Sequence, residues 1–254
     1  MTKPINALIR KEWRYNRGKI LPLSIGLAIF GFLSVGLLLI LPDIIPYVEA
    51  LMPEITPSMA IESYMDSVNS IVSIIAVILC ADAIAGEREK NTLVLIRTKP
   101  IKVHSIILTK LFARYVIVLI GTIFGAISVY LFTYLMVGPP DMGLLLLSLL
   151  VYSLILFVYT SIGILISTLA KSQISAGAFS AGIVLVISLV SAFLIFGDIV
   201  NYNMFQLSSN LLIMHFTPLT IVLNCVALLV IGLVVLSITI VLFYSEKEPT
   251  RKKV

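Results

Sequence analysis

The chain has 254 residues, of which 59% are hydrophobic and 12% are charged. Soluble domains carry about one quarter charged residues, so this composition excludes a soluble globular domain and indicates a membrane protein that crosses the bilayer several times. The formal net charge is +5. Because the basic residues are distributed over loops beside apolar runs, we attribute them to contacts with lipid headgroups and expect no nucleic-acid partner.

The first 19 residues are polar and amphipathic. Between residues 4 and 18, apolar residues recur at helical spacing while basic residues occupy other faces, which predicts a helix lying in the membrane interface. The apolar positions of this interfacial helix are Ile5, Leu8, Ile9 and Trp13. The alternative is an ordinary basic stretch beside the membrane.

Six apolar runs are long enough to cross a hydrocarbon core, which takes about 20 residues in a helix. They lie at residues 20–41, 67–85, 115–137, 142–170, 173–197 and 217–245. The second run reaches this length only if Asp82 lies in its last turn, near the interface. Together the runs predict an all-α integral membrane protein with a single transmembrane domain over residues 1–254.

Lys and Arg favour the cytoplasmic side of short loops. If the amino terminus lies inside the cell, all 18 basic residues fall on the cytoplasmic side of the six runs. Seven acidic residues then fall outside. We therefore expect a multi-pass protein of the cell membrane with both termini in the cytoplasm.

Residues 86–100 form a charged, partly apolar segment between the second and third runs. Its apolar side chains would leave an exposed patch without a partner, so we predict that the segment docks onto a soluble protein through charged and apolar contacts. The residues expected at this contact are Gly86, Glu87, Arg88, Glu89, Asn91, Thr92, Leu93, Leu95 and Ile96. Alternatively, the segment is a solvated loop whose apolar residues lie on the membrane surface.

Asp82 is the only acidic residue within the apolar runs. Ionisable residues inside membranes often mark transport pathways, but this one lies near the end of its run. We expect it to pair with Lys110 or Arg114, and we prefer this role to one in transport.

Small residues cluster in the fifth run, where they permit close approach of another helix in lipid. The face that they form includes Gly177, Ala178, Ala181 and Gly182, and we expect it to contact protein. Gly121 and Gly125 make a lone Gly-xxx-Gly pair in the third run, which is a weaker signal and fits packing within one subunit.

The chain offers little for catalysis. His104 and His215 fall on opposite sides of the predicted membrane and lack partners for a metal or a nucleophile, and the sequence has no phosphate-binding loop. Ionisable residues at mid-membrane are scarce, which disfavours ion-coupled transport. We expect no enzyme activity, metal or cofactor on this chain, so that any nucleotide hydrolysis must come from another protein.

The order of motifs around residues 86–100 resembles that of ABC-2 type transporter permeases. The residues that carry the resemblance are Asp82-Ala83-Ile84, Gly86-Glu87-Arg88-Glu89, Thr92-Leu93, Lys99-Pro100-Ile101 and Lys110. Six spans and an amphipathic amino-terminal "elbow" helix agree with it. The resemblance implies a dimer with a second copy or a paralogue, in which each half binds a separate ATPase subunit that holds ATP and Mg²⁺.

The same resemblance implies that residues 86–100 are the segment that couples to the ATPase, that the first, second and fifth spans line the path, and that the protein is an exporter. Asn91 stands where the family often has Gly. If that position needs a left-handed backbone, Asn is the next most tolerant residue, so we expect the turn to be kept. Two alternatives remain open: a membrane anchor that docks a soluble enzyme, and a transporter that needs no ATPase.

Overall fold

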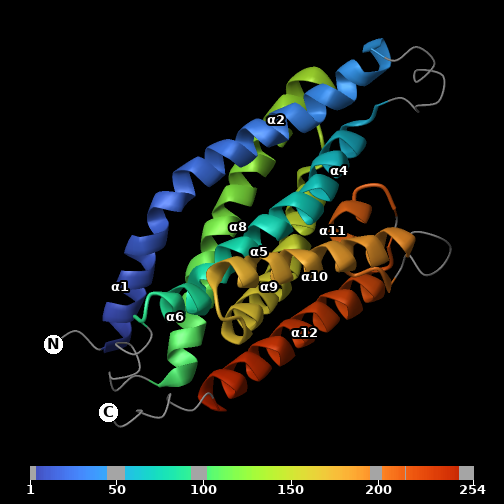
Figure 1. The fold of residues 1–254 in the computed structure, drawn as a ribbon. Coiled ribbons are helices and arrows are strands. Elements are labelled where there is room, and N and C mark those ends of the chain that lie inside the picture. Colours follow the sequence, from blue (N-terminus) through green and yellow to red (C-terminus); the bar gives the residue numbers. More distant parts are fainter. Residues whose placement is uncertain (1–3, 45–54, 93–101, 195–201, 215, 246–254) are drawn as a thin grey trace, which may run out of the picture.

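The computed structural model describes residues 4–44, 55–92, 102–194, 202–214 and 216–245. The long elements in this part of the chain are helices (Figure 1), which confirms the predicted all-α fold. The elements are α1 (Pro4–Asn16), η1 (Arg17–Lys19), α2 (Ile20–Ile44), α4 (Pro57–Ser67), η2 (Val68–Val72), α5 (Ser73–Ala81), η3 (Asp82–Gly86), α6 (Glu87–Glu89), α8 (Val103–Met136), α9 (Met142–Leu169), α10 (Gln173–Phe193), α11 (Leu207–Asn210) and α12 (Pro218–Ser245). Of these, η1 is a 3-10 helix, whereas η2 and η3 are wider π-helical turns.

Six helices are long and apolar enough to cross a membrane, as predicted: Ala7–Leu41, Pro57–Glu89, Val103–Met136, Met142–Leu169, Gln173–Phe193 and Pro218–Ser245. Three of them begin earlier than the apolar runs of the sequence. The first begins at Ala7 and not at residue 20, the second at Pro57 and not at residue 67, and the third at Val103 and not at residue 115. All three extensions contain polar or charged residues, which end an apolar run although a helix can continue through them.

Side-chain caps set where three helices begin. The hydroxyl of Thr56 accepts the amide of Met59 at 3.3 Å before α4, and Asp141 caps α9 in the same way. Ser172 and Ser175 form a capping box at the start of α10. These side chains satisfy amides that have no partner within their own helix.

The second span, α4 to α6, is the central helix of the bundle. In its most apolar stretch 61% of the residues are buried inside the protein, compared with 22% for the first and fifth spans and 28% for the sixth. Tyr64 of α4 is fully buried, and its hydroxyl donates to the carbonyl of Thr122 in α8 at 3.1 Å. From the other side, the buried Tyr152 of α9 donates to the carbonyl of Val68 at 3.4 Å. The central helix is thus held between α8 and α9.

Glycines allow two close helix contacts around this core. A Cβ atom on Gly125 of α8 would lie 3.0 Å from the carbonyl oxygen of Leu27 in α2, and one on Gly163 of α9 would lie 2.7 Å from Cβ of Cys80 in α5. A larger residue at either place would push a helix away. Since Gly125 belongs to the Gly-xxx-Gly pair, that pair packs inside one subunit, as expected.

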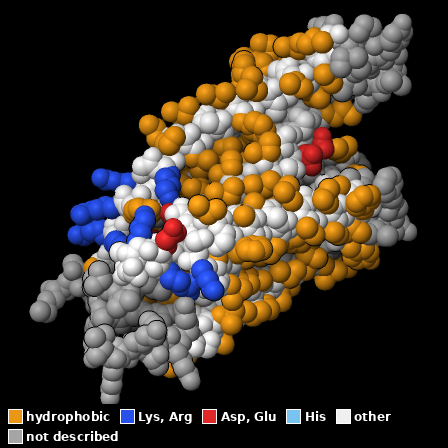
Figure 2. Space-filling view, in the orientation of Figure 1, with side chains coloured by type: hydrophobic (Ala, Val, Ile, Leu, Met, Phe, Trp, Pro, Cys, Tyr) orange, Lys and Arg blue, Asp and Glu red, His pale blue; other side chains and the backbone are white. Residues whose placement is uncertain are grey.

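Basic side chains gather at one end of the bundle, which we call the basic end (Figure 2). It includes α1, η1, α6, the start of α8 and the turn between α9 and α10 (Figure 1). Its described basic residues are Arg10, Lys11, Arg14, Arg17, Lys19, Arg88, Lys90, Lys102, Lys110, Arg114 and Lys171. Beyond the basic end, the surface in this view is largely apolar (Figure 2), as the contact with a hydrocarbon core requires.

Candidate functional site

Residues 86–92, which we call the α6 segment, follow the central helix at the basic end. After α6 the chain turns at Asn91, whose φ of 54° is left-handed. The amide of Asn91 donates to the carbonyl of Arg88 at 3.1 Å, and that of Thr92 donates to Glu87 at 2.9 Å, which is the Schellman arrangement of a helix end. The left-handed turn expected at Asn91 is therefore confirmed.

Two side chains attach the α6 segment to the turn between α9 and α10. Arg88 donates to the carbonyl of Thr168 at 2.8 Å and also to that of Ala170. Both carbonyls lie at the end of α9, where no amide of the same helix can reach them. A carboxylate oxygen of Glu89 accepts the amide of Gln173 at 3.1 Å, in the first turn of α10. The segment thus caps the end of one helix and the start of the next.

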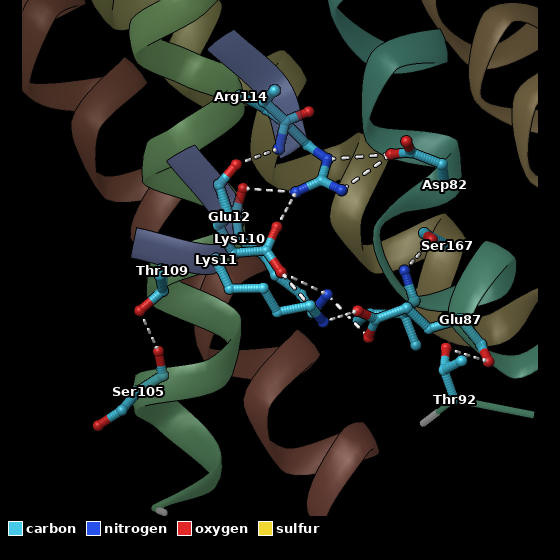
Figure 3. A network of polar contacts seen from close by, with 12 residues as sticks. Lys11, Glu12, Asp82, Glu87, Thr92, Ser105, Thr109, Lys110, Arg114 and Ser167 are labelled. Carbon is cyan, nitrogen blue, oxygen red and sulfur yellow. Dashed lines mark hydrogen bonds and ion pairs between the residues drawn. The ribbon is translucent and has the colours of Figure 1, made fainter. Parts of the chain in front are cut away.

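Glu87 joins the α6 segment to two further helices (Figure 3). Its Oε1 lies 2.9 Å from Nζ of Lys11 in α1, and its Oε2 lies 2.8 Å from Nζ of Lys110 in α8. The side chain of Glu87 is 15% exposed and that of Lys110 is 1% exposed. Because a buried pair is screened little by salt and water, the contact with Lys110 holds α6 against α8. The side chain of Lys11 is 52% exposed, so the contact with α1 is weaker.

The ion pairs continue toward the interior (Figure 3). Glu12 of α1 contacts Lys110 at 3.2 Å and Arg114 at 3.3 Å. Arg114 in turn contacts one oxygen of Asp82 at 2.8 Å, and Lys19 of η1 contacts the other at 3.1 Å. Among the described residues, the side chains joined in this way are Lys11, Glu12, Lys19, Asp82, Glu87, Lys110 and Arg114, which we call the charge network.

Burial makes this pairing matter for stability. The side chains of Glu12 and Arg114 are each 3% exposed, and that of Asp82 is 10% exposed. An unpaired charge in such surroundings is costly, whereas a paired and hydrogen-bonded one largely offsets the cost of leaving water. The charge network therefore joins α1, η1, η3, α6 and α8 without isolating any of its charges.

Ser167 of α9 completes the backbone of η3. Its Oγ accepts the amides of Ile84 and Ala85, both at 3.0 Å, and donates to the carbonyl of Ala81 at 2.9 Å. A π turn interrupts the regular pairing of an α-helix, and a buried amide left without a partner is costly. One hydroxyl from a neighbouring helix thus fixes the widened turn between α5 and α6.

Residues 42–224 match the family model of ABC-2 family transporter proteins. The chain belongs to this family. The match covers more than half of the chain and runs from the end of α2 into α12, so the central helix and the α6 segment lie within it. Among curated proteins, none matches the chain.

Asp82 of this ABC-2 protein pairs with Arg114, which confirms one of its two predicted partners. The other candidate, Lys110, pairs with Glu12 instead. The contact of Asp82 with Lys19 is not expected from the sequence, because apolar runs do not tell which loops lie side by side at the basic end.

The amino-terminal helix is present as α1, but its four apolar positions do not share one environment. Leu8 is buried against α8, whereas Ile9 is 48% and Trp13 41% exposed; the side chain of Ile5 lies outside the described residues. The buried face continues from Leu8 to Glu12, one turn later. Sequence reasoning overlooks Glu12, although its spacing from Leu8 is a usable signal. That α1 lies in the membrane interface stays a prediction.

The predicted docking residues lie only partly on the surface of the ABC-2 protein. Glu89 and Asn91 are exposed; Glu87, Arg88 and Thr92 are half-buried; Gly86 is buried. Leu93, Leu95 and Ile96 lie outside the described residues. The charged side chains expected to orient a partner make the contacts within the chain given above, so the docking of a partner here stays a prediction.

The small-residue face of α10 is partly open. Ala178 is exposed, Gly177 and Ala181 are half-buried, and a Cβ atom on Gly182 would have no neighbour within 4 Å among the described groups. The other side of α10, with its buried Ser180, packs on α5 and α9. The open face is available to another chain, and its role as a dimer or pathway face stays a prediction.

The acidic residues of the charge network pair with basic residues. Among the described residues, no three His, Cys, Asp or Glu side chains form a group that could hold a metal ion. The carboxylates of the charge network form ion pairs with Lys and Arg side chains. These ion pairs link α1, η1, η3, α6 and α8 at the basic end.

Proposed function

We propose that this ABC-2 family protein is the membrane-spanning permease of an ATP-driven exporter in the cell membrane. Two permease chains, identical or paralogous, would form the path, and a separate ATPase subunit on each would bind ATP and Mg²⁺. The basic end would face the cytoplasm because short cytoplasmic loops are rich in Lys and Arg, and we expect both termini there. Membership of a family of transporter proteins is the basis of this proposal.

The observation that carries the coupling step is the attachment of the α6 segment to separate parts of the bundle. Glu87 contacts α1 and α8, Arg88 contacts the end of α9, and Glu89 contacts the start of α10. A loop that only connects two spans needs none of these contacts. They would pass a displacement of the α6 segment to four other helices.

Closure of the ATPase subunits would push on the exposed residues 89–91. Since η3 joins the α6 segment to α5 without a break, the push would shift the central helix along its contacts with α9 and α10. Packed helices move between a few discrete arrangements and do not deform continuously. Such a shift would open or close the path between two permease chains.

A photo-reactive amino acid in place of Lys90 tests this proposal in native membranes. Lys90 is exposed in the α6 segment, and we expect its replacement to crosslink to an ATPase subunit, which mass spectrometry would recognise by its phosphate-loop motif. The matched control is the same group in place of Leu37, which is 65% exposed on α2. The control should not crosslink to the ATPase.

Purification through a tag on the permease separates the possible outcomes. Recovery of an ATPase that hydrolyses ATP, together with the crosslink at position 90, would support the proposal. Absence of an ATPase from both experiments would refute it and favour a membrane anchor. An ATPase that copurifies without a crosslink at position 90 would support the role as a permease but refute docking of the ATPase on the α6 segment.

A further inference from the structure

A groove between α2 and α8 opens on the apolar surface next to the basic end. Its volume is about 390 Å³, and its lining consists of Arg17, Ile20, Leu21, Ser24, Ile25, Ala28 and Phe124. Ser24 is 7% exposed and lies deepest, whereas Leu21, Ile25 and Phe124 are 70%, 51% and 53% exposed and form the rims. Small side chains below large ones leave this part of the surface hollow.

We propose that the groove binds an acyl chain of an anionic phospholipid whose phosphate pairs with Arg17. The lining is apolar except for Arg17 at one end and Ser24 in the middle. Arg17 is exposed and forms no ion pair with the described residues, so its guanidinium is available to a phosphate, which it can bind with two hydrogen bonds.

The groove runs from the interface into one lipid leaflet. Residues 17 and 28 are eleven positions apart, which corresponds to about 16 Å along a helix. Half of a hydrocarbon core is about 15 Å thick, and the headgroup region adds about 5–7 Å on each side. A lipid whose phosphate lies at Arg17 would therefore place its ester groups near the middle of the lining and the first part of an acyl chain beside Ile25, Ala28 and Phe124.

The basic side chains near Arg17 favour an anionic lipid headgroup. Arg10 and Arg14 are exposed on α1, within two turns before Arg17, and the acidic side chains nearest in the fold are already paired within the charge network. Juxtamembrane basic residues attract anionic lipids by about 1 kcal/mol each. A phospholipid with a net negative headgroup fits this end of the groove better than a zwitterionic one.

Ser24 is the polar side chain in the middle of the groove lining. Its Oγ is buried and has no hydrogen-bond partner among the described residues, although serines within helices commonly donate to a carbonyl one turn earlier. Rotation of this side chain toward the groove would let it donate to an ester oxygen of a phospholipid. The lipid binding inferred from the groove needs no ATPase, so its test is independent of the proposed function.

The single Trp of the chain, Trp13, makes a direct test possible. In the variant Trp13→Phe/Phe124→Trp, the only indole lies on the rim of the groove. The full chain is placed in phosphatidylcholine vesicles with increasing phosphatidylglycerol, and one of the two lipids carries dibrominated acyl chains. Bromine quenches Trp fluorescence at short range, so the quenching curve reports which lipid occupies the groove.

A second reporter chain, Trp13→Phe/Val234→Trp, is the matched control. Val234 lies on α12 and is 51% exposed, close to the 53% of Phe124. It lies ten positions before Tyr244, or about 15 Å from the basic end of α12. At position 124 we expect phosphatidylglycerol to bind about fivefold more tightly than phosphatidylcholine, the equivalent of about 1 kcal/mol. At position 234 we expect no preference.

Three further substitutions assign the effect to the groove. Arg17→Gln should abolish the preference at position 124, and Ser24→Leu should weaken quenching by both lipids because leucine fills the hollow. Lys171→Gln removes an exposed charge elsewhere at the basic end. It should change neither the preference for phosphatidylglycerol nor the strength of quenching at position 124. Each variant is also measured with the reporter at position 234, where a lost fold would change the quenching.

Three results would overturn the proposal. Equal preference for phosphatidylglycerol at positions 124 and 234 would show general attraction of anionic lipid to the protein. A preference at position 124 that survives both Arg17→Gln and Ser24→Leu would place the lipid outside the groove. Weak quenching by both lipids at position 124 alone would show that protein, such as a second copy of the chain, covers the groove.

Discussion

Arg114 of α8 and Asp82 of η3 are joined by two hydrogen bonds, since Nη2 and Nε of the guanidinium lie 2.8 Å and 3.2 Å from the same carboxylate oxygen. The guanidinium also reaches Glu12 of α1 at 3.3 Å and the carbonyl of Leu79 at 3.1 Å. One side chain thus connects the amino-terminal helix, the third span and the central helix, and its loss would affect all three.

Replacement of Arg114 by Met should lower the free energy of unfolding by about 3 kcal/mol, because it removes one basic partner from each of two buried carboxylates and leaves Asp82 with Lys19 and Glu12 with Lys110. The measurement is denaturant unfolding of the purified chain in detergent. Arg10→Met, which removes an exposed charge from α1, should have little effect. Adding Asp82→Asn to Arg114→Met should recover part of the loss, and a double variant as unstable as the sum of the single ones would contradict the pairing.

The widened turn η3 should depend on one hydroxyl. Ser167→Ala removes the acceptor of two buried amides and should cost about 2 kcal/mol in unfolding free energy. Ser153→Ala is the matched control on the same helix, because Ser153 only donates to the carbonyl of Leu150 within α9. Equal stability of the two variants, measured by thermal unfolding, would show that η3 does not need Ser167.

Two glycines should respond oppositely to the same change. Gly163→Ala places a methyl group 2.7 Å from Cβ of Cys80, so it should separate α9 from α5 and cost about 1–3 kcal/mol. Gly26→Ala meets no atom within 4 Å and should be neutral or stabilise the helix by up to about 1 kcal/mol. Chemical unfolding of both variants measures whether each substitution lowers or raises the free energy of unfolding. An unchanged free energy for Gly163→Ala would contradict the close contact.

The turn at Asn91 should accept glycine and resist a β-branched residue. Asn91→Gly keeps the left-handed backbone, whereas Asn91→Val should disfavour it by about 1–2 kcal/mol. Hydrogen exchange of the amide of Thr92, which donates to Glu87 at 2.9 Å, reports this locally. We expect faster exchange in Asn91→Val only. Equal exchange in the two variants would argue against a left-handed turn in solution.

The open face of α10 should matter for assembly and not for folding. Gly182→Ile adds a side chain where the described structure has free space, so unfolding of the chain should be unchanged. If this face contacts a second permease, the dimer should dissociate about tenfold more readily, which corresponds to 1.4 kcal/mol. Mass photometry in detergent measures this, with Ser237→Ile on the exposed side of α12 as the control. Equal dimer fractions in both variants would show that this face is not part of the dimer interface.

The helices could be predicted because lipid demands long apolar runs, but the charge network could not. Lys110 and Arg114 lie inside α8, yet their charge excludes them from the apolar run that predicts this helix. Both are buried because acids from other helices pair with them. Periodicity shows which residues share a face of one helix, and it does not show which distant helix supplies the partner.

The same limit of local sequence patterns explains why the turn in the α6 segment could be predicted but its side-chain contacts could not. Asn91 could be assigned to a left-handed turn because that preference is local to one residue. Glu87 was expected to face a partner because it stands beside other charges, whereas its contacts are with Lys11 and Lys110. Local chemistry predicts backbone shape well, but the direction of a charged side chain depends on neighbours distant in sequence.

The central helix changes its neighbours part-way along, and η2 lies where this happens. Before η2, α4 packs on α2 and α8; after it, α5 packs mainly on α9 and α10. A π turn holds about one residue more than an α turn, so it rotates all later side chains by about 100° relative to an unbroken helix. A homologue with one residue fewer between Met65 and Ser73 could form an unbroken α-helix there and still present the same sides of its second span to each neighbour. A homologue of the same length without the π turn would instead rotate α5 relative to α9 and α10.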